Sequence, residues 1–393
     1  MNQKTLIGLA LAAVLGFVLA FVVGHFDKPR TDVAGGQGEM SLVPSLRDHV
    51  NEIDRVVVTG AGGKPIATMT RGANGWSIAE KNGFGVDTGK LREFLLKLAD
   101  AKLVEQKTSN KEKYATLGVE DVAAADAKSV EVELGGLKQP VKVIVGNANA
   151  RGGTFVRRAG EAESWLASGS ISVDKKVENW LRKDVADVAA ARVASVTITR
   201  PDGKVVRIAK DSEGDTSFKL ADVPKGREPA SEFTINGIAG TLAGLRFDDV
   251  VPAAEAAPPE KPLDARFATF DGLVVDVVAW EKDGKNYARL TASEDKDRAT
   301  SHAAAEQAKP KSEPENAEAK SDAPKPADDE VAAIGKEAAE LDQRAKGWTF
   351  VLPAYKYANL NKSIDELLKP PEEKKPDAKG AVKKPEPAKK GGG

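Results

Sequence analysis

The chain has 393 residues, of which 30% are charged, and its formal net charge is -1 at pH 7. This balance excludes the strong basic field that most nucleic-acid-binding proteins carry, so no nucleic-acid partner is expected. Cysteine is absent. Its absence excludes disulfides, thiolate catalysis, iron–sulfur clusters and zinc sites built on cysteine.

The first strong pattern is the apolar run from Leu6 to Val23, which contains no charged side chain. As a helix this run would span roughly 27 Å, about the thickness of the hydrocarbon core of a bilayer. A cleaved signal peptide is the alternative, because Lys4 precedes the run, but no small-residue cleavage site closes it. We therefore expect an uncleaved transmembrane anchor over residues 1–26. Basic residues on its two sides are nearly balanced, so charge alone is a poor guide to sidedness.

A segment rich in Gly, Pro and polar residues, 27–45, follows and predicts a flexible tether. The first folded unit is expected over residues 46–190, with Asn74-Gly75 as its clearest hairpin signal. Asp87 is the predicted N-cap of a helix, because apolar residues recur after it at helical spacing. These apolar residues are Leu91, Phe94, Leu95 and Leu98. The predicted strands are 54–59, 65–71, 76–78, 129–134, 141–145 and 154–158.

The pattern then repeats at an offset of about 140–145 residues, which predicts a second, related unit over residues 191–368. The matched segments are 193–199 with 53–59, 217–220 with 76–78, and 347–351 with 153–156.

The second copy is interrupted over residues 293–330, where Ala, Lys, Glu, Pro and Ser dominate and large apolar side chains are almost absent. This composition predicts a disordered insertion. A helix is predicted at the end of the insertion from the spacing of Val331, Ile334, Ala338 and Leu341. Residues 369–393 predict a disordered Lys/Pro-rich tail. The expected fold class is α+β: a transmembrane helix, then two tandem related units of antiparallel sheet with packed helices.

Taken together, these segments resemble a known family. The order is an apolar N-terminal run, a strand pair ending in Gly75-Trp76, the helical sequence LREFLLKLADAKLVE, Tyr114 to Gly118 with Asp121, Val143 to Gly146, and Thr154 to Val156. This order resembles the uncharacterised bacterial family named domain of unknown function 4340 (DUF4340), over roughly 46–368 apart from the insertion. The resemblance implies an N-terminal membrane anchor, an extracytoplasmic domain and proximity to an ABC-type transport system. It brings no active-site residues.

Residues suited to catalysis are scarce. Histidine occurs only at His25 beside the apolar run, at His49 before the first strand, and at His302 in the predicted insertion. A catalytic triad needs a histidine in a structured pocket, and none of the three is predicted to occupy one. HExxH, Walker A and GxGxxG signatures are missing. No catalytic, cofactor-binding or metal-binding residue is predicted.

Arg151, Arg157 and Arg158 are the candidates for binding an anion, because they surround one predicted hairpin. The competing interpretation is a hairpin loop beside a solvated strand face. The carboxylate pair Glu131 and Glu133, at i and i+2, is predicted to mark the outer face of a strand.

The expected function is non-enzymatic. We expect a single-pass protein of the bacterial inner membrane, with the bulk of the chain in the periplasm. It would serve as an accessory or scaffold component of a membrane complex, with ABC-type transporter components as expected partners and no cofactor. The alternative is a periplasmic ligand-binding module that uses the cleft between the two units.

Overall fold

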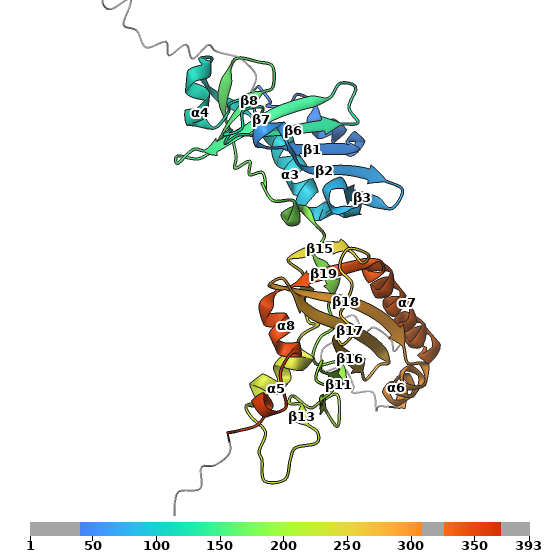
Figure 1. Ribbon diagram of the computed structural model, residues 1–393. Helices are drawn as coiled ribbons and strands as arrows, with labels where there is room; N and C mark the ends of the chain where they lie inside the picture. Colours follow the sequence, from blue (N-terminus) through green and yellow to red (C-terminus); the bar gives the residue numbers. More distant parts are fainter. Residues whose placement is uncertain (1–39, 309–325, 371–393) are drawn as a thin grey trace, which may run out of the picture. The chain divides into compact units, whose positions relative to one another are not determined.

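The computed structural model describes residues 40–308 and 326–370 (Figure 1). The chain divides into two compact units, and the boundaries differ from the predicted division at residue 190. Within the described residues, the first unit comprises 40–53, Gly60–Gly63 and Glu93–Val173, and the second unit comprises Asp54–Thr59, Lys64–Arg92, 174–308 and 326–370.

The first sheet has nine strands in the order β4-β3-β2-β1-β6-β7-β8-β9-β5. Its strands are β1 (Arg55–Thr59), β2 (Pro65–Gly72), β3 (Gly75–Ile78), β4 (Phe84–Gly85), β5 (Leu103–Thr108), β6 (Val130–Gly135), β7 (Val141–Ala148), β8 (Thr154–Arg158) and β9 (Ser164–Ala167). The α-helices of this half of the chain are α2 (Leu46–His49), α3 (Thr88–Asp100) and α4 (Tyr114–Leu117). Its 3-10 turns are η1 (Val50–Glu52), η2 (Ala61–Gly63), η3 (Ala79–Lys81), η4 (Lys111–Lys113) and η5 (Val177–Trp180).

The second sheet has eight strands in the order β13-β12-β11-β16-β17-β18-β19-β15. Its strands are β11 (Val193–Thr199), β12 (Val205–Ala209), β13 (Lys219–Leu220), β15 (Asp249–Pro252), β16 (Leu263–Thr269), β17 (Leu273–Lys282), β18 (Lys285–Glu294) and β19 (Trp348–Leu352). The pair β10 (Asp184–Ala186) and β14 (Leu245–Arg246) forms a separate two-stranded sheet. The helices are α5 (Glu232–Ala239), α6 (Lys296–Ala308), α7 (Ala327–Ala345) and α8 (Ala354–Leu360), with a final 3-10 turn η6 (Asp365–Leu367).

The two sheets share one strand order. The equivalent strands are β1 and β11, β2 and β12, β3 and β13, β6 and β16, β7 and β17, β8 and β18, β9 and β19, and β5 and β15. In addition, α5 precedes β15 along the chain as α3 precedes β5. A shared order over eight strands supports the internal repeat that the sequence predicts.

The predicted alignment of the repeat is wrong by one strand at its end. Residues 347–351 were matched to 153–156 in β8, but β19 occupies the place of β9. The cause is β16, which the prediction omitted. Its buried residues alternate with the exposed Asp264 and Arg266, and these charges together with Pro262 hide the strand pattern.

Three further expectations need correction. The fold class is wrong in its first element: no helix within residues 40–308 and 326–370 is long and apolar enough to cross a membrane. The run Leu6–Val23 itself lies outside the described residues.

The predicted tether reaches too far, because Leu42 and Val43 are buried. The predicted insertion, 293–330, contains the helix α6 and the start of α7, while most of the predicted tail also lies outside the described residues.

Two local predictions are confirmed. The Asp87 side chain accepts a hydrogen bond from the Lys90 amide at 2.9 Å, so Asp87 caps α3. The four predicted apolar residues of α3 are all buried. The hairpin predicted at Asn74-Gly75 joins β2 to β3, where Gly75 pairs with Gly72 and has a φ of 98° that favours glycine.

The turns at Gly272 and Gly284 provide a matched test of how the second sheet holds α6. Both glycines have positive φ, 93° and 71°, but a Cβ at Gly272 would lie 2.7 Å from the Asp295 carbonyl oxygen and 2.8 Å from Ala299. At Gly284 it would meet nothing within 4 Å. We expect Gly284→Ala to lower the free energy of unfolding by about 1 kcal/mol. Gly272→Ala should lower it by about 3 kcal/mol, because backbone atoms must also move.

Urea denaturation followed by circular dichroism measures both variants. Equal losses for the two substitutions would contradict the close packing of α6 on the Gly272 turn.

Candidate functional site

The helices α6 and α7 lie between β18 and β19 in the chain and pack beside each other next to β18 (Figure 1). The Asp295 side chain caps α6 by accepting a hydrogen bond from the Arg298 amide at 3.1 Å. On α6 only Ala299 and Ala303 are buried, and His302 and Glu306 are half-buried on the same side. The spacing i, i+3, i+4, i+7 places all four on one helix face.

Glu213 reaches this face from the loop after β12. The loop is anchored by Lys210, whose ammonium group is buried and donates to the carbonyl oxygens of Ala191 at 2.8 Å and Glu213 at 3.4 Å. At the next turn, Asp215 accepts the amides of Ser212 and Asp211 at 3.0 and 3.1 Å. The hydrogen bond from Ser212 lowers the pKa of Asp215. These contacts fix the backbone that presents Glu213.

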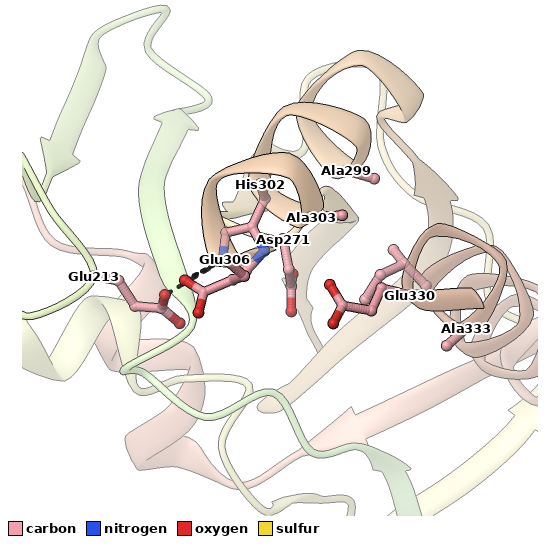
Figure 2. Close-up of a pocket in the computed structure, with 9 residues that line it drawn as sticks. Glu213, Asp271, Ala299, His302, Ala303, Glu306, Glu330 and Ala333 are labelled. Carbon is pink, nitrogen blue, oxygen red and sulfur yellow. Dashed lines mark hydrogen bonds and ion pairs between the residues drawn. The ribbon is translucent and has the colours of Figure 1, made fainter. Parts of the chain in front are cut away.

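Three side chains therefore converge, as Figure 2 shows. The His302 Nε2 atom lies 3.3 Å from a carboxylate oxygen of Glu213 and 3.9 Å from one of Glu306. The three possible ligand atoms all lie within 4.8 Å of one another. An imidazole nitrogen and two carboxylates are groups that can hold a metal ion, and they can also form hydrogen-bonded ion pairs.

The cluster lines one side of an open pocket of about 380 Å³. Its lining comprises Glu213, Asp271, Ala299, His302, Ala303, Glu306, Glu330, Ala333 and Ile334. Asp271 and Glu330 project into the same space (Figure 2). The lining thus contains four carboxylates and one imidazole, but neither lysine nor arginine, so the pocket has a negative potential.

Arg192 holds the structure behind this pocket. Its guanidinium group donates to both carboxylate oxygens of Glu337 on α7, each at 2.9 Å, and to Asp271 at 2.8 Å. The hydrogen bonds that Arg192 donates to Glu337, with the charge of Asp271, raise the pKa of Arg192 above its ordinary value. Asp271 is therefore largely neutralised by Arg192, while Glu213, Glu306 and Glu330 supply the remaining acidic groups.

The three arginines proposed as anion ligands do not form one site. Arg157 is buried, donates to the carbonyl oxygens of Val119 at 2.9 Å and Glu161 at 3.0 Å, and also pairs with Asp121. Arg158 follows it on β8 and donates to the carbonyl oxygens of Leu42 and Ser41 at 2.9 and 2.8 Å. Successive strand residues point to opposite faces. These two guanidinium groups hold the main chain in place, and Arg151 lies exposed in the preceding hairpin loop.

Of the histidines, His302 is on α6 and not in a structureless insertion, which corrects its predicted location. His49 ends α2 and pairs with Glu52 at 2.7 Å. His25 lies outside the described residues.

The strand-face interpretation of Glu131 and Glu133 is confirmed. β6 alternates buried and half-exposed residues, and both carboxylates pair with Lys142, at 3.6 and 2.9 Å. Hydrogen bonding to Glu133 raises the pKa of Lys142.

Comparison with protein families matches one segment of the chain to a known family. Residues 76–266 match the family described as domain of unknown function, DUF4340. This segment of the chain, residues 76–266, belongs to the DUF4340 family. In the comparisons with curated proteins and with solved structures, no match was found.

The DUF4340 match includes Arg192 and Glu213 but ends before α6 and α7. The acidic pocket therefore combines residues of the family framework with residues of a segment beyond the matched part. Sequence reasoning missed this pocket. The available signal was the i, i+4 spacing of His302 and Glu306 in an alanine-rich stretch with high helix propensity.

Replacing Arg192 tests its role. Arg192→Lys keeps one positive charge but loses the two parallel bonds to Glu337, so we expect the free energy of unfolding to fall by about 1–3 kcal/mol. The matched control is Arg207→Lys, because Arg207 pairs with Asp222 in an exposed ion pair, with 53% and 68% of the side chains accessible. An exposed pair contributes about 0–1 kcal/mol, so the control should change stability little. Urea unfolding compares the two variants. Equal losses in the free energy of unfolding would contradict a larger stabilising role for Arg192 than for an exposed ion pair.

Proposed function

We propose that this DUF4340 protein is a non-enzymatic accessory or scaffold subunit of a complex in the cell envelope. On this proposal it works by binding another protein. The association with an ABC-type transport system rests on the family resemblance. The observation that carries partner binding is a pair of exposed aromatic side chains on two adjacent helices of the second unit.

The first exposed ring belongs to α5. Ser231 caps this helix by accepting a hydrogen bond from the Phe233 amide at 3.2 Å. Ile235 and Ile238 are buried beneath the helix, whereas Phe233 remains 87% exposed. Full burial of a phenylalanine side chain is favourable by about 1.5–3 kcal/mol. Burial of the Phe233 ring against a partner would therefore stabilise the complex.

The second ring belongs to α8, where Tyr355 is 64% exposed. The neighbouring residue, Lys356, is buried and donates to the carbonyl oxygens of Thr241 and Ala243, each at 2.8 Å, and of Gly240 at 3.2 Å. Burial lowers the pKa of Lys356. Lys356 ties the start of α8 to the segment that follows α5, so the two adjacent helices that carry Phe233 and Tyr355 brace each other (Figure 1).

Exposed aromatic residues on rigid elements are typical of the residues that dominate protein–protein binding. The buried Arg157 and Lys356 and the half-buried Arg192 are engaged with carbonyl oxygens or carboxylates of the fold itself. Because these basic groups stabilise the fold and are not directed toward a substrate, they favour a scaffold function over a catalytic one.

Serine substitution of the two aromatic residues tests the proposal. We expect the double variant Phe233→Ser and Tyr355→Ser to lose at least about tenfold in partner affinity, since central aromatic contacts contribute 2 kcal/mol or more. Stability should change by no more than about 0.5 kcal/mol, because both side chains are exposed. Crosslinking in intact cells followed by mass spectrometry measures partner recovery.

Val104→Ser is the matched control, because Val104 is a 64% exposed apolar residue on β5 in the other unit. Its crosslinked products should equal those of the unmodified chain. Undiminished crosslinking of the double variant to every recovered protein would refute a binding role for the α5–α8 face.

A further inference from the structure

The strongest unexplained feature outside the α5–α8 face is the convergence of Glu213, His302 and Glu306. From this geometry we propose that the three side chains bind one Zn²⁺ ion. The proposal is independent of the scaffold function, because it concerns other residues of the second unit.

The distances fit a tetrahedral ion. With Zn–N and Zn–O bonds of about 2.0–2.2 Å, neighbouring ligands of a tetrahedral zinc lie roughly 3.3–3.5 Å apart. The His302 Nε2 atom is 3.3 Å from Glu213 and 3.9 Å from Glu306. The carboxylates of Glu213 and Glu306 lie within 4.8 Å of each other, so small side-chain movements would bring all three ligands to one ion. Its spacing of four residues from His302 places both ligands on one face of α6.

The pocket supplies an independent argument. A hydrogen-bonded ion pair alone explains one imidazole and one carboxylate, but this lining holds four carboxylates and no lysine or arginine. Arg192 satisfies Asp271 from outside the lining. Among the described residues, the half-buried Glu330 side chain has no hydrogen-bond or ion-pair partner. Carboxylates gathered around an open space attract a cation, since walls of low dielectric focus the field.

The donor set favours zinc over calcium. Imidazole nitrogen suits Zn²⁺ and neighbouring transition metals, whereas Ca²⁺ takes six to eight oxygen ligands. Three protein ligands leave one tetrahedral position open, and the pocket of about 380 Å³ has room for a water molecule or a fourth carboxylate there. Ala299 and Ala303 lie beside His302 and Glu306 on the same face of α6 and are too small to crowd the ion.

Zinc binding would join two segments that are distant in sequence. Glu213 and His302 are 89 residues apart, and they belong to the loop after β12 and to α6. Because the unfolded chain does not hold these ligands together, the free energy of binding adds to the stability of the fold. We therefore expect zinc to raise the melting temperature of the chain.

The test uses the full-length chain without a histidine tag. Isothermal titration with ZnCl₂ should give one equivalent of binding, and CaCl₂ under the same conditions should bind far more weakly. His302→Gln should weaken zinc binding by at least about tenfold, as should Glu306→Gln. His49→Gln is the matched control, because it removes a histidine that also pairs with a glutamate, Glu52 at 2.7 Å, in the other unit.

Thermal unfolding keeps the test independent of folding defects. Without metal, the three variants should melt within a few degrees of the unmodified chain, since these side chains are exposed or half-buried. With zinc, only the unmodified chain and His49→Gln should gain stability. Zinc affinity that survives in His302→Gln, or that falls equally in His49→Gln, would overturn the proposal, and so would the absence of zinc binding by the unmodified chain.

Discussion

The packing of α7 against the second sheet depends on the hydrogen bonds that Arg192 donates to two carboxylates. Arg192 lies immediately before β11, Asp271 lies in the turn between β16 and β17, and Glu337 lies on α7. One planar guanidinium group thereby joins the first strand of the second repeat, its central hairpin and the helix that packs beside β18. A guanidinium can do this because its five donors are fixed in one plane, so several acceptors are held in a defined geometry at once.

This contact also explains why an alanine-rich segment can form helices here. α6 buries only Ala299 and Ala303, so it gains little from the hydrophobic effect. It is held instead by the cap from Asp295, by a hydrogen bond from Arg298 to the Thr269 carbonyl oxygen at 3.1 Å, and by α7, which Arg192 fixes. A composition that lacks large apolar residues therefore predicts disorder correctly only when no tertiary contact compensates.

Much of the fold could be predicted because local and global preferences agree. The helix after Asp87 combines a cap with apolar spacing, and the turn at Gly75 combines Asn-Gly with alternating strands. The prediction failed at β16, where the alternation is carried by Leu263, Ala265 and Phe267 and is masked by charged outward residues. A sheet with one solvated face permits such charges, so a charged stretch can still be a central strand.

The acidic pocket could not be predicted for a related reason. It joins residues from a loop and a helix that are 89 positions apart, and that proximity exists only once β12 and the α6–α7 pair are in place. The single local clue was the spacing of His302 and Glu306, which has meaning only if the segment is helical. A disordered segment has no helix face, so the sequence prediction could not bring these two side chains together.

The two repeats share a framework but differ where the pocket forms. Between β8 and β9 the chain needs only residues 159–163, whereas between the equivalent β18 and β19 it runs from 295 to 347. This long connection lies beyond the DUF4340 match, which ends at residue 266. Because the strand order is the same in both sheets, the second sheet can support this long connection, which is free to carry polar groups. An acidic, half-exposed helix face supported in this way contributes little to the core, which is why His302 and Glu306 are better explained by a ligand than by packing.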